Sequence, residues 1–375
     1  MLRRAPFLAL SLAALASCGN AFEPASSIQS LRIIAVRNEA PYTAAGETAS
    51  LSMLYFDGSK RAFDAQGNRK RTPQILWLGG CFNPPGDLYF GCFPVLAQLF
   101  ASLGQAPGAG AAGAPAGPPP AAPGGLNPLD YISLSPTFKM KIPEDIISRR
   151  PPEEVAAAEA QGNKPYGLSY VFFAICGGEI RPVTDAANGL PLGCFDKETN
   201  ERLGDDDFVV GYTPIYTFNG ISNKNPILDG VQFEGTASMN QPCAAGCAQG
   251  TRCGSQGVCI PVVPHCAERK VADCPTYKIK PLLTREKNIE KDEAAPPFDG
   301  RTPDEVIWAT FYASDGTLDN DTALINDANK GWAFDDSDGA KWSAPNAPAG
   351  ESRIWVVVRD NRGGTVWNWQ DVFVD

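Results

Sequence analysis

The sequence contains very little histidine. His265 is the single histidine among 375 residues, so a catalytic triad, a histidine general base or a histidine-rich metal site has at most one candidate. Because it lies between cysteines, we assign His265 a loop role. No glycine-rich phosphate loop or nucleophile elbow follows an expected strand. The sequence therefore predicts a protein that is not an enzyme and that has no cofactor.

An apolar run long enough to cross a bilayer, about 20 residues, is also missing. Near the N-terminus, two arginines are followed by the apolar residues Phe7 to Leu15 and then by small residues. This order is typical of a cleaved export signal over residues 1–17. Leu15-Ala16-Ser17-Cys18 resembles the lipobox of bacterial lipoproteins, which implies acyl chains, such as palmitate, on Cys18. Gly19 rather than Asp follows, which by the enteric sorting rule implies the outer membrane.

The alternative is an ordinary secretory signal, which would leave Cys18 as an odd thiol. The cysteine count favours lipid attachment at Cys18, because the other ten of the eleven cysteines are then left to pair with one another. An even number suits five disulfides in an oxidising compartment. Residues 18–28 are mostly small and polar, and we expect them to form a tether between the membrane and the fold.

Composition predicts an all-β protein. The 37 glycines and 33 prolines break helices, and aromatic residues, 10% of the chain, suit pleated sheets. The length allows two domains, which we place at residues 29–222 and 223–375. Residues 105–125 are almost entirely Ala, Gly and Pro, so we expect a disordered loop in the first domain. The net charge of −10 argues against a nucleic-acid partner.

The end of the chain resembles the end of bacterial immunoglobulin-like and PKD-like repeats. The shared residues are, in order, Trp342-Ser343-Ala344-Pro345, Gly350, Ile354 to Arg359, Asp360 and Gly363-Gly364. Residues 41 to 47 resemble the connection between the first two strands of such domains, and Trp77 stands where a sandwich has its buried tryptophan. The resemblance implies two immunoglobulin-like β-sandwiches.

A cluster of six cysteines lies within residues 243–274 and is expected to be a disulfide-rich insert in the second domain. It has no C-x2-C pair, so disulfides are favoured over zinc and we predict no metal. Its first four cysteines resemble small EGF-like inserts. The expected pairs are Cys243 with Cys253, Cys247 with Cys259, Cys266 with Cys274, Cys81 with Cys92, and Cys176 with Cys194. A rival pairing in the first domain joins Cys81 to Cys176.

Six of the seven tryptophans lie between residues 308 and 369. An exposed row of Trp332, Trp342, Trp367 and Trp369 would suggest that the second domain binds carbohydrate by stacking. In the alternative interpretation, Trp308 and Trp355 fill the sandwich core while Trp367 or Trp369 covers one face.

Two acidic runs are candidates for carboxylate chemistry or calcium binding. They are Asp205-Asp206-Asp207 and Asp335-Asp336-Ser337-Asp338, to which Asp315, Asp319 and Asp321 can be added for calcium. None matches an EF-hand loop, and solvated turns are the alternative for all of them.

These patterns favour a structural or adhesive protein of the cell envelope. We expect it to bind another envelope protein through sandwich edges, loops or the Cys-rich insert. A carbohydrate-binding protein with a glycan partner is the second hypothesis. The third, a hydrolase, requires two carboxylates about 5–9.5 Å apart across a cleft.

Overall fold

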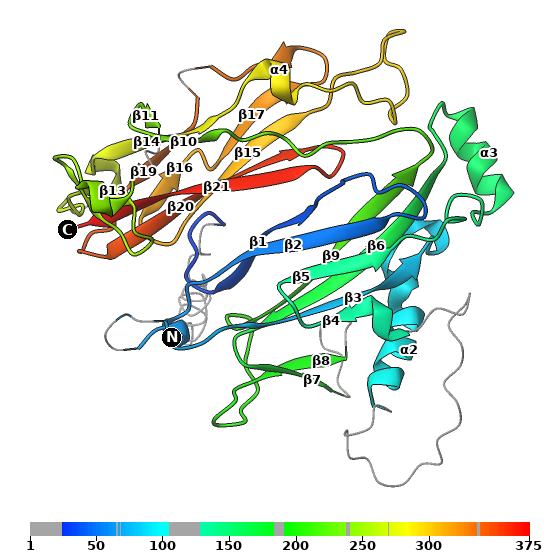
Figure 1. Cartoon of the computed structure of the whole chain (residues 1–375), viewed down its shortest axis with the longest axis horizontal. Helices are drawn as coiled ribbons and strands as arrows, with labels where there is room; N and C mark the ends of the chain where they lie inside the picture. Colours follow the sequence, from blue (N-terminus) through cyan, green and yellow to red (C-terminus); the bar gives the residue numbers. More distant parts are fainter. Residues whose placement is uncertain are drawn as a thin grey trace, which may run out of the picture.

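Two β-sandwiches make up the computed structural model (Figure 1). The structure describes residues 25–64, 67, 69–104, 128–183, 191–237, 241–268, 270–335 and 338–375. The predicted signal segment with Cys18 and the loop at 105–125 lie outside these residues. Within the described parts of the chain, no helix is both long and apolar enough to cross a membrane. The all-β, immunoglobulin-like prediction is confirmed.

The first sandwich packs a three-stranded sheet on a four-stranded sheet. The three-stranded sheet has the order β1 (Leu31–Asn38), β2 (Thr48–Asp57), β5 (Thr137–Lys141). The four-stranded sheet has the order β4 (Ile132–Ser133), β3 (Gln74–Phe82), β6 (Tyr166–Cys176), β9 (Phe208–Phe218). A separate hairpin joins β7 (Glu179–Pro182) and β8 (Leu192–Phe195), and the helices are α2 (Phe93–Gly104) and α3 (Pro152–Ala160).

The central strand β6 is buried on both faces, as its continuous apolar sequence predicts. One face carries Phe173, which meets Trp77 of β3 at 5.6 Å between ring centroids, and Trp77 stacks on Phe138 of the opposite sheet at 5.9 Å. The other face carries Phe172, whose ring lies 6.5 Å from that of Phe93 at the start of α2. Helix α2 therefore covers part of the outer face of this sheet.

The second sandwich is larger, and the insert extends one of its sheets. One sheet has the order β11 (Thr236–Ala237), β10 (Gly230–Phe233), β14 (Thr276–Leu282), β19 (Ala340–Ser343), β16 (Thr317–Asp319). The other has the order β12 (Thr251–Cys253), β13 (Cys259–Val263), β21 (Thr365–Val374), β20 (Gly350–Asp360), β15 (Ile307–Ala313), β17 (Thr322–Asp327), β18 (Gly331–Trp332). A short helix, α4 (Arg285–Asn288), precedes β15. Because β13 pairs with β21, the insert covers a sheet edge that would otherwise be open.

All five predicted disulfides are present. They join Cys81 to Cys92, Cys176 to Cys194, Cys243 to Cys253, Cys247 to Cys259, and Cys266 to Cys274. The rival pairing of Cys81 with Cys176 is wrong, because Cys81 lies opposite Tyr170 whereas Cys176 lies opposite Gln74. Six residues of β6 separate these positions, which is about 20 Å of strand.

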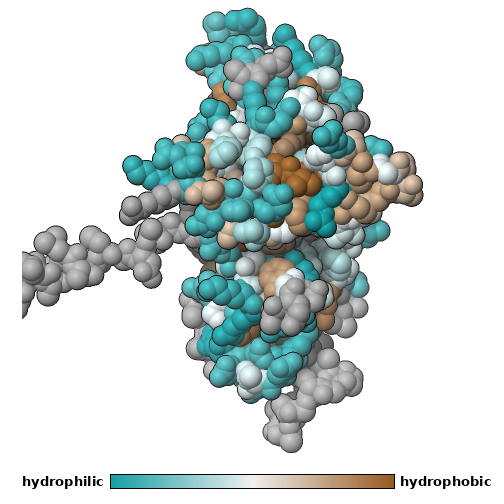
Figure 2. Space-filling model, turned by 90° about the vertical axis from the view of Figure 1, so that its left-hand side faces the viewer, coloured by the Kyte–Doolittle hydropathy of each residue, from teal (hydrophilic) through white to brown (hydrophobic). Residues whose placement is uncertain are grey.

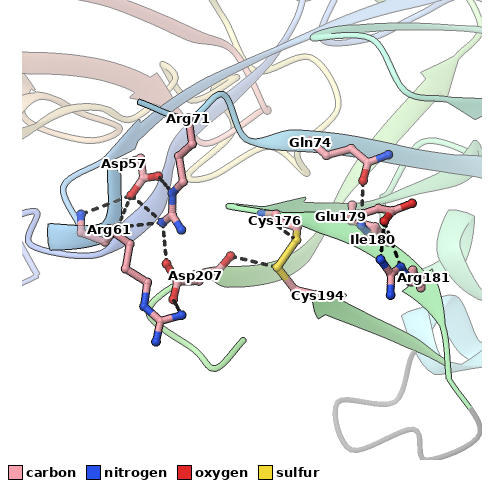
Figure 3. Close-up of a disulfide and its surroundings, with 12 residues drawn as sticks. Asp57, Arg61, Arg71, Gln74, Cys176, Glu179, Ile180, Arg181, Cys194 and Asp207 are labelled. Atoms are coloured by element: carbon pink, nitrogen blue, oxygen red, sulfur yellow. Dashed lines mark hydrogen bonds and ion pairs between the residues drawn. A yellow bond between two sulfur atoms is a disulfide. The ribbon is translucent and has the colours of Figure 1, made fainter. Parts of the chain in front are cut away.

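A partly buried arginine lies close to the Cys176–Cys194 disulfide (Figure 3). Arg71 binds Asp57 at 2.9 Å and Asp207 at 2.5 Å, so it joins β2 to the start of β9. The backbone oxygen of Asp207 in turn lies 3.4 Å from the Cys194 sulfur. This cluster and the disulfide together hold one end of the first sandwich.

An apolar cluster joins the two sandwiches. Successive residues of β20 point to opposite faces: Ile354, Val356 and Val358 enter the core of the second sandwich. Trp355 and Val357 instead pack on Ile34 and neighbouring residues of the first sandwich. Placing Trp355 in the sandwich core was therefore wrong. Both faces of β20 are buried, so the sequence pattern alone cannot show which face lies in the core of the second sandwich.

The start of the described chain also lies between the sandwiches. Ser26, Ser27 and Ile28, which we assigned to the tether, are buried. The Ile28 amide donates to the Ala313 carbonyl at 3.0 Å, and the Ala313 amide donates to the Ser26 carbonyl at 2.8 Å. Farther along the chain, Asn225 binds the Asn38 carbonyl with its side-chain amide. Both segments therefore hold the sandwiches together.

The β20–β21 hairpin contains a buried charged network. Arg362 binds Glu305 and Glu290, each at 2.8 Å, and the Arg362 and Glu305 side chains are almost fully buried. In the turn itself, Asp360 accepts from the backbone amides of Arg362 and Gly364. A Cβ at Gly364 would lie 2.0 Å from the Asp360 carboxylate, so this position of the Gly-Gly pair requires glycine.

We expect the free energy of unfolding to fall as the pH rises from about 4.5 to about 7. The Glu305→Gln variant should lack the part of this decrease that comes from the titration of Glu305. Burial raises the pKa of Glu305 from 4.5 to about 7, more than Arg362 lowers it. The folded protein therefore keeps a proton that the unfolded chain has released, so this stabilisation is full below pH 4.5 and is lost through pH 7. Urea unfolding across this range, with Glu293→Gln as an exposed control, tests the expectation. Equal pH dependence in wild type and Glu305→Gln would contradict it.

Candidate recognition surface

The four candidate tryptophans do not form a stacking platform. Trp342 is fully buried, and its indole nitrogen donates to the Asp315 carbonyl. Trp367 is half-buried under Arg37, 4.9 Å from its ring, and Trp332 is half-buried and bonds to the Phe334 carbonyl. Trp369 alone is exposed, at 39%. The condition for sugar stacking, two exposed coplanar rings, is not met.

The single histidine and the clustered cysteines have structural positions. The His265 ring bonds the carbonyl of Asp375 at 2.7 Å, which joins the insert to the end of the chain. The sulfurs of Cys243, Cys247 and Cys259 lie within 4.8 Å of one another, a spacing that could hold a metal. All three belong to disulfides, so they are not the thiolates that bind metals.

The acidic runs are not brought together. Asp205 and Asp206 are exposed, whereas Asp207 is buried on Arg71. Among the described residues the cysteine group is the only cluster with metal-ligand spacing, so Asp315, Asp319 and Asp321 do not form one. Asp335 is exposed and its amide donates to the Asp338 carboxylate, as in a solvated turn. Asp336 lies outside the described residues.

A patch of exposed apolar side chains lies on the outer face of the first sandwich, and the sequence analysis did not identify it. Five of the eleven large hydrophobic side chains that are exposed in the described chain gather here. The members of this aromatic patch are Leu88 (47% exposed), Tyr89 (38%), Phe90 (52%), Phe93 (36%) and Tyr212 (44%). The ring of Tyr89 stacks on Tyr212 at 4.5 Å and touches the rings of Phe90 and Phe93 at 5.8 and 6.1 Å. Exposed apolar side chains that gather on one surface are typical of interaction sites.

The backbone under the aromatic patch is held rigidly. The Cys81–Cys92 disulfide closes the loop that carries Leu88 to Phe90. Asn83 continues the pairing of β3 with β6, since its amide donates to the Leu168 carbonyl at 2.7 Å and its side chain accepts from the Leu168 amide at 2.9 Å. Asp87 has a positive φ of 57°, which its side-chain contacts stabilise. The exposed rings therefore rest on a fixed base.

Asp87 is the centre of a polar network beside the aromatic patch. Its carboxylate accepts from Arg150 and from the Tyr166 hydroxyl at 2.6 Å, and its backbone oxygen accepts from the Tyr170 hydroxyl at 2.9 Å. Burial, and then the bond to Asp87, raises the pKa of Tyr166 to about 12. Tyr166 therefore stays protonated at neutral pH and keeps donating. The Arg150 guanidinium also lies 4.4 Å from the Tyr166 ring.

The Cys-rich insert offers a different kind of surface. Figure 2 faces the end of the molecule where β13 and the C-terminus lie, and the coloured surface there is mainly hydrophilic, with hydrophobic areas near its middle and at its right-hand side. Arg252 in the insert packs over the Phe373 ring at 3.7 Å. The insert therefore attaches to the second sandwich through a contact between a cation and an aromatic ring as well as through the pairing of β13 with β21.

One signal in the sequence could have located the aromatic patch. Leu88-Tyr89-Phe90 lies inside a short loop between two cysteines that are expected to pair, one residue after a Pro-Pro-Gly turn. A closed loop of that length leaves little room to bury three large side chains. Tyr212 carried no comparable signal, because its exposure depends on which face of β9 remains uncovered.

No protein-family model matches the chain, and no curated protein matches its sequence. Among solved structures, fibronectin(III)-like modules of CbhA from Clostridium thermocellum are 9% identical, with 91% of this chain and 94% of theirs covered and a TM-score of 0.16. Dimeric latent PorU from Porphyromonas gingivalis is 8% identical, with 93% of this chain and 24% of that chain covered and a TM-score of 0.17. These scores carry no functional argument. The immunoglobulin-like architecture rests on the strands and sheets of the chain itself.

Proposed function

We propose that this chain is a non-enzymatic, lipid-anchored protein of the cell envelope that binds another protein through the aromatic patch. The observation that carries the proposal is a group of exposed rings in contact with one another through Tyr89 on a disulfide-closed base. Aromatic side chains are enriched among the residues that contribute most to protein interfaces. A base that is already ordered also lowers the entropy cost of binding.

Export and anchoring are supported by the sequence and the disulfides together. Five disulfides are typical of proteins in oxidising compartments. The lipobox-like residues before Cys18 support a lipid anchor, and Gly19 supports the outer membrane. From Cys18 to the buried Ser26 the chain can span at most about 28 Å. The junction of the sandwiches would then lie close to the membrane.

The two rival functions have less support. A hydrolase requires a pair of carboxylates free to act on a substrate, whereas Asp57 and Asp207 both bind Arg71, and Glu290 and Glu305 both bind Arg362. A carbohydrate-binding site built from tryptophans requires a platform that the structure does not form.

Photo-cross-linking in cells that naturally produce the protein tests the proposal. A benzophenone amino acid at Phe90 is expected to give one discrete protein adduct, because Phe90 is the most exposed ring of the aromatic patch at 52%. The same probe at Phe298, exposed at 65% but on the second sandwich, serves as the matched control and is expected to give no such adduct.

A second substitution tests the aromatic patch as a unit. Tyr89→Ala removes the ring that touches three of its neighbours, and it is expected to weaken binding of the cross-linked protein at least about 30-fold, as for an interface residue worth 2 kcal/mol or more. Identical adducts from Phe90 and Phe298, or an affinity unchanged by Tyr89→Ala, would refute the proposed surface.

A further inference from the structure

A cleft of about 520 Å³ lies at the junction of the two sandwiches. It is bounded by β1 and β9 of the first sandwich and by the β20–β21 hairpin of the second. Ligand sites occur preferentially at such domain junctions and have volumes of roughly 300–1,000 Å³. Tyr212 of the aromatic patch is among the residues that line the cleft, whereas Leu88, Tyr89, Phe90 and Phe93 are not.

The cleft is positively charged in an acidic protein. Arg359 and Arg362 are the charged residues among those that line it, and no carboxylate does so, although the chain has a net charge of −10. Arg362 already contacts the carboxyl groups of Glu305 and Glu290. Arg359 is half-buried and bonds the Ile34 carbonyl at 2.7 Å and the Thr310 hydroxyl at 3.4 Å, both neutral groups. A half-buried guanidinium without a described carboxylate partner favours an anion beside it.

Two strand edges face the cleft. In the described sheets β1 pairs with β2 alone and β9 pairs with β6 alone. The two edges meet where the Leu31 amide donates to the Asp206 carbonyl. They meet again where the backbones of Tyr42 and Tyr216 form an isolated parallel β-bridge. Between these points the cleft is lined by residues 33–36 and 38 on one side and by residues 212–214 and 216 on the other. An edge strand presents alternate N–H and C=O groups that can pair with another chain.

The edge of β9 is the more available of the two. On β1 the Ile34 carbonyl is taken by Arg359 and the Asn38 carbonyl by Asn225. On β9 no described hydrogen bond outside its pairing with β6 uses a backbone group of residues 212–215, although the Pro214 nitrogen carries no N–H. Asn38 also lines the cleft, is 92% buried, and has a side-chain oxygen with no donor.

We propose that this cleft binds an extended peptide segment that carries a carboxylate. The peptide pairs with the edge of β9, as in strand addition to a sheet, and its Asp or Glu side chain contacts the Arg359 guanidinium. Backbone pairing supplies affinity without regard to sequence, while the arginine selects an acidic residue at one position.

A phage library of random octapeptides, presented to the full chain, tests the proposal. The expected result is enrichment of peptides with Asp or Glu at one fixed position. For the best synthetic peptide, calorimetry should show at least tenfold weaker binding to Arg359→Gln. Arg37→Gln is the matched control, because Arg37 lies on β1 but packs on Trp367 outside the cleft, and it should leave the affinity unchanged.

Changes in the peptide keep the test valid if Arg359→Gln loosens the domain junction. Replacing the acidic residue by Gln or Asn should weaken binding at least tenfold to the wild-type chain. N-methylation at alternate backbone positions should abolish binding in one of the two registers and spare the other. Failure to enrich acidic peptides, equal binding to Arg359→Gln, or insensitivity to N-methylation would each overturn the proposal. Glutarate binding as tightly as the peptide would show a small-anion site instead.

Discussion

Replacement of Trp355 by alanine is expected to lower the free energy of unfolding by about 3–5 kcal/mol and to separate the unfolding of the two sandwiches. Trp355 is 2% exposed and lies in the apolar cluster between the sandwiches, with its ring 4.8 Å from that of Phe56 on β2. Removing it leaves a cavity at the junction and not inside either core. Domains joined by a weakened interface move and unfold more independently.

Calorimetry measures both effects. The wild-type chain should show one cooperative unfolding transition, and Trp355→Ala should show two. Of these two, the transition at the lower temperature should differ most from the wild-type Tm. Trp369→Ala is the matched control, because Trp369 pairs directly with Trp355 across β20 and β21 but is 39% exposed. We expect it to cost less than about 1 kcal/mol. Equal losses for the two variants would mean that the junction contributes little stability.

Replacement of Cys18 by serine is expected to abolish lipid attachment. A single acyl chain gives marginal membrane binding, and two or three chains make it stable, so loss of the modified cysteine should release nearly all of the mature chain from the membrane. Labelling with radioactive palmitate and mass spectrometry of the N-terminal peptide measure the modification directly.

Asn20→Ser is the control for this substitution, since it changes a neighbouring residue and leaves the four lipobox-like residues intact. It should keep both label and membrane attachment. Label in Cys18→Ser, or a mature wild-type chain with an unmodified Cys18, would show that the N-terminus is an ordinary secretory signal.

The disulfides illustrate what spacing along a chain can predict. Four of the five predicted pairs join cysteines 8–12 residues apart, and the fifth joins cysteines 18 residues apart. Short loops bring such thiols together with little loss of chain entropy. The rival pair, Cys81 with Cys176, depended on the register of β3 and β6, which no local pattern specifies.

The tryptophans illustrate the limit of the same reasoning. Alternation along β20 correctly separates the face of Ile354 from the face of Trp355, but it does not say what covers each face. Trp355 is buried because a second sandwich packs on it. Trp342, a candidate for an exposed platform, fills the core because β19 lies inside its sheet, between β14 and β16, and turns this side chain toward the opposite sheet.

By itself, the sequence determined the fold class, the lipobox-like N-terminus, the central strand β6 and the disulfide pairs, because each depends on residues close together in the chain. Tertiary structure alone decided the junction of the sandwiches, the cleft beside Arg359 and the exposure of Tyr89 beside Tyr212. These surfaces join residues more than a hundred positions apart. Their burial and charge depend on which faces meet, and that is set by packing between sheets, not by any local pattern.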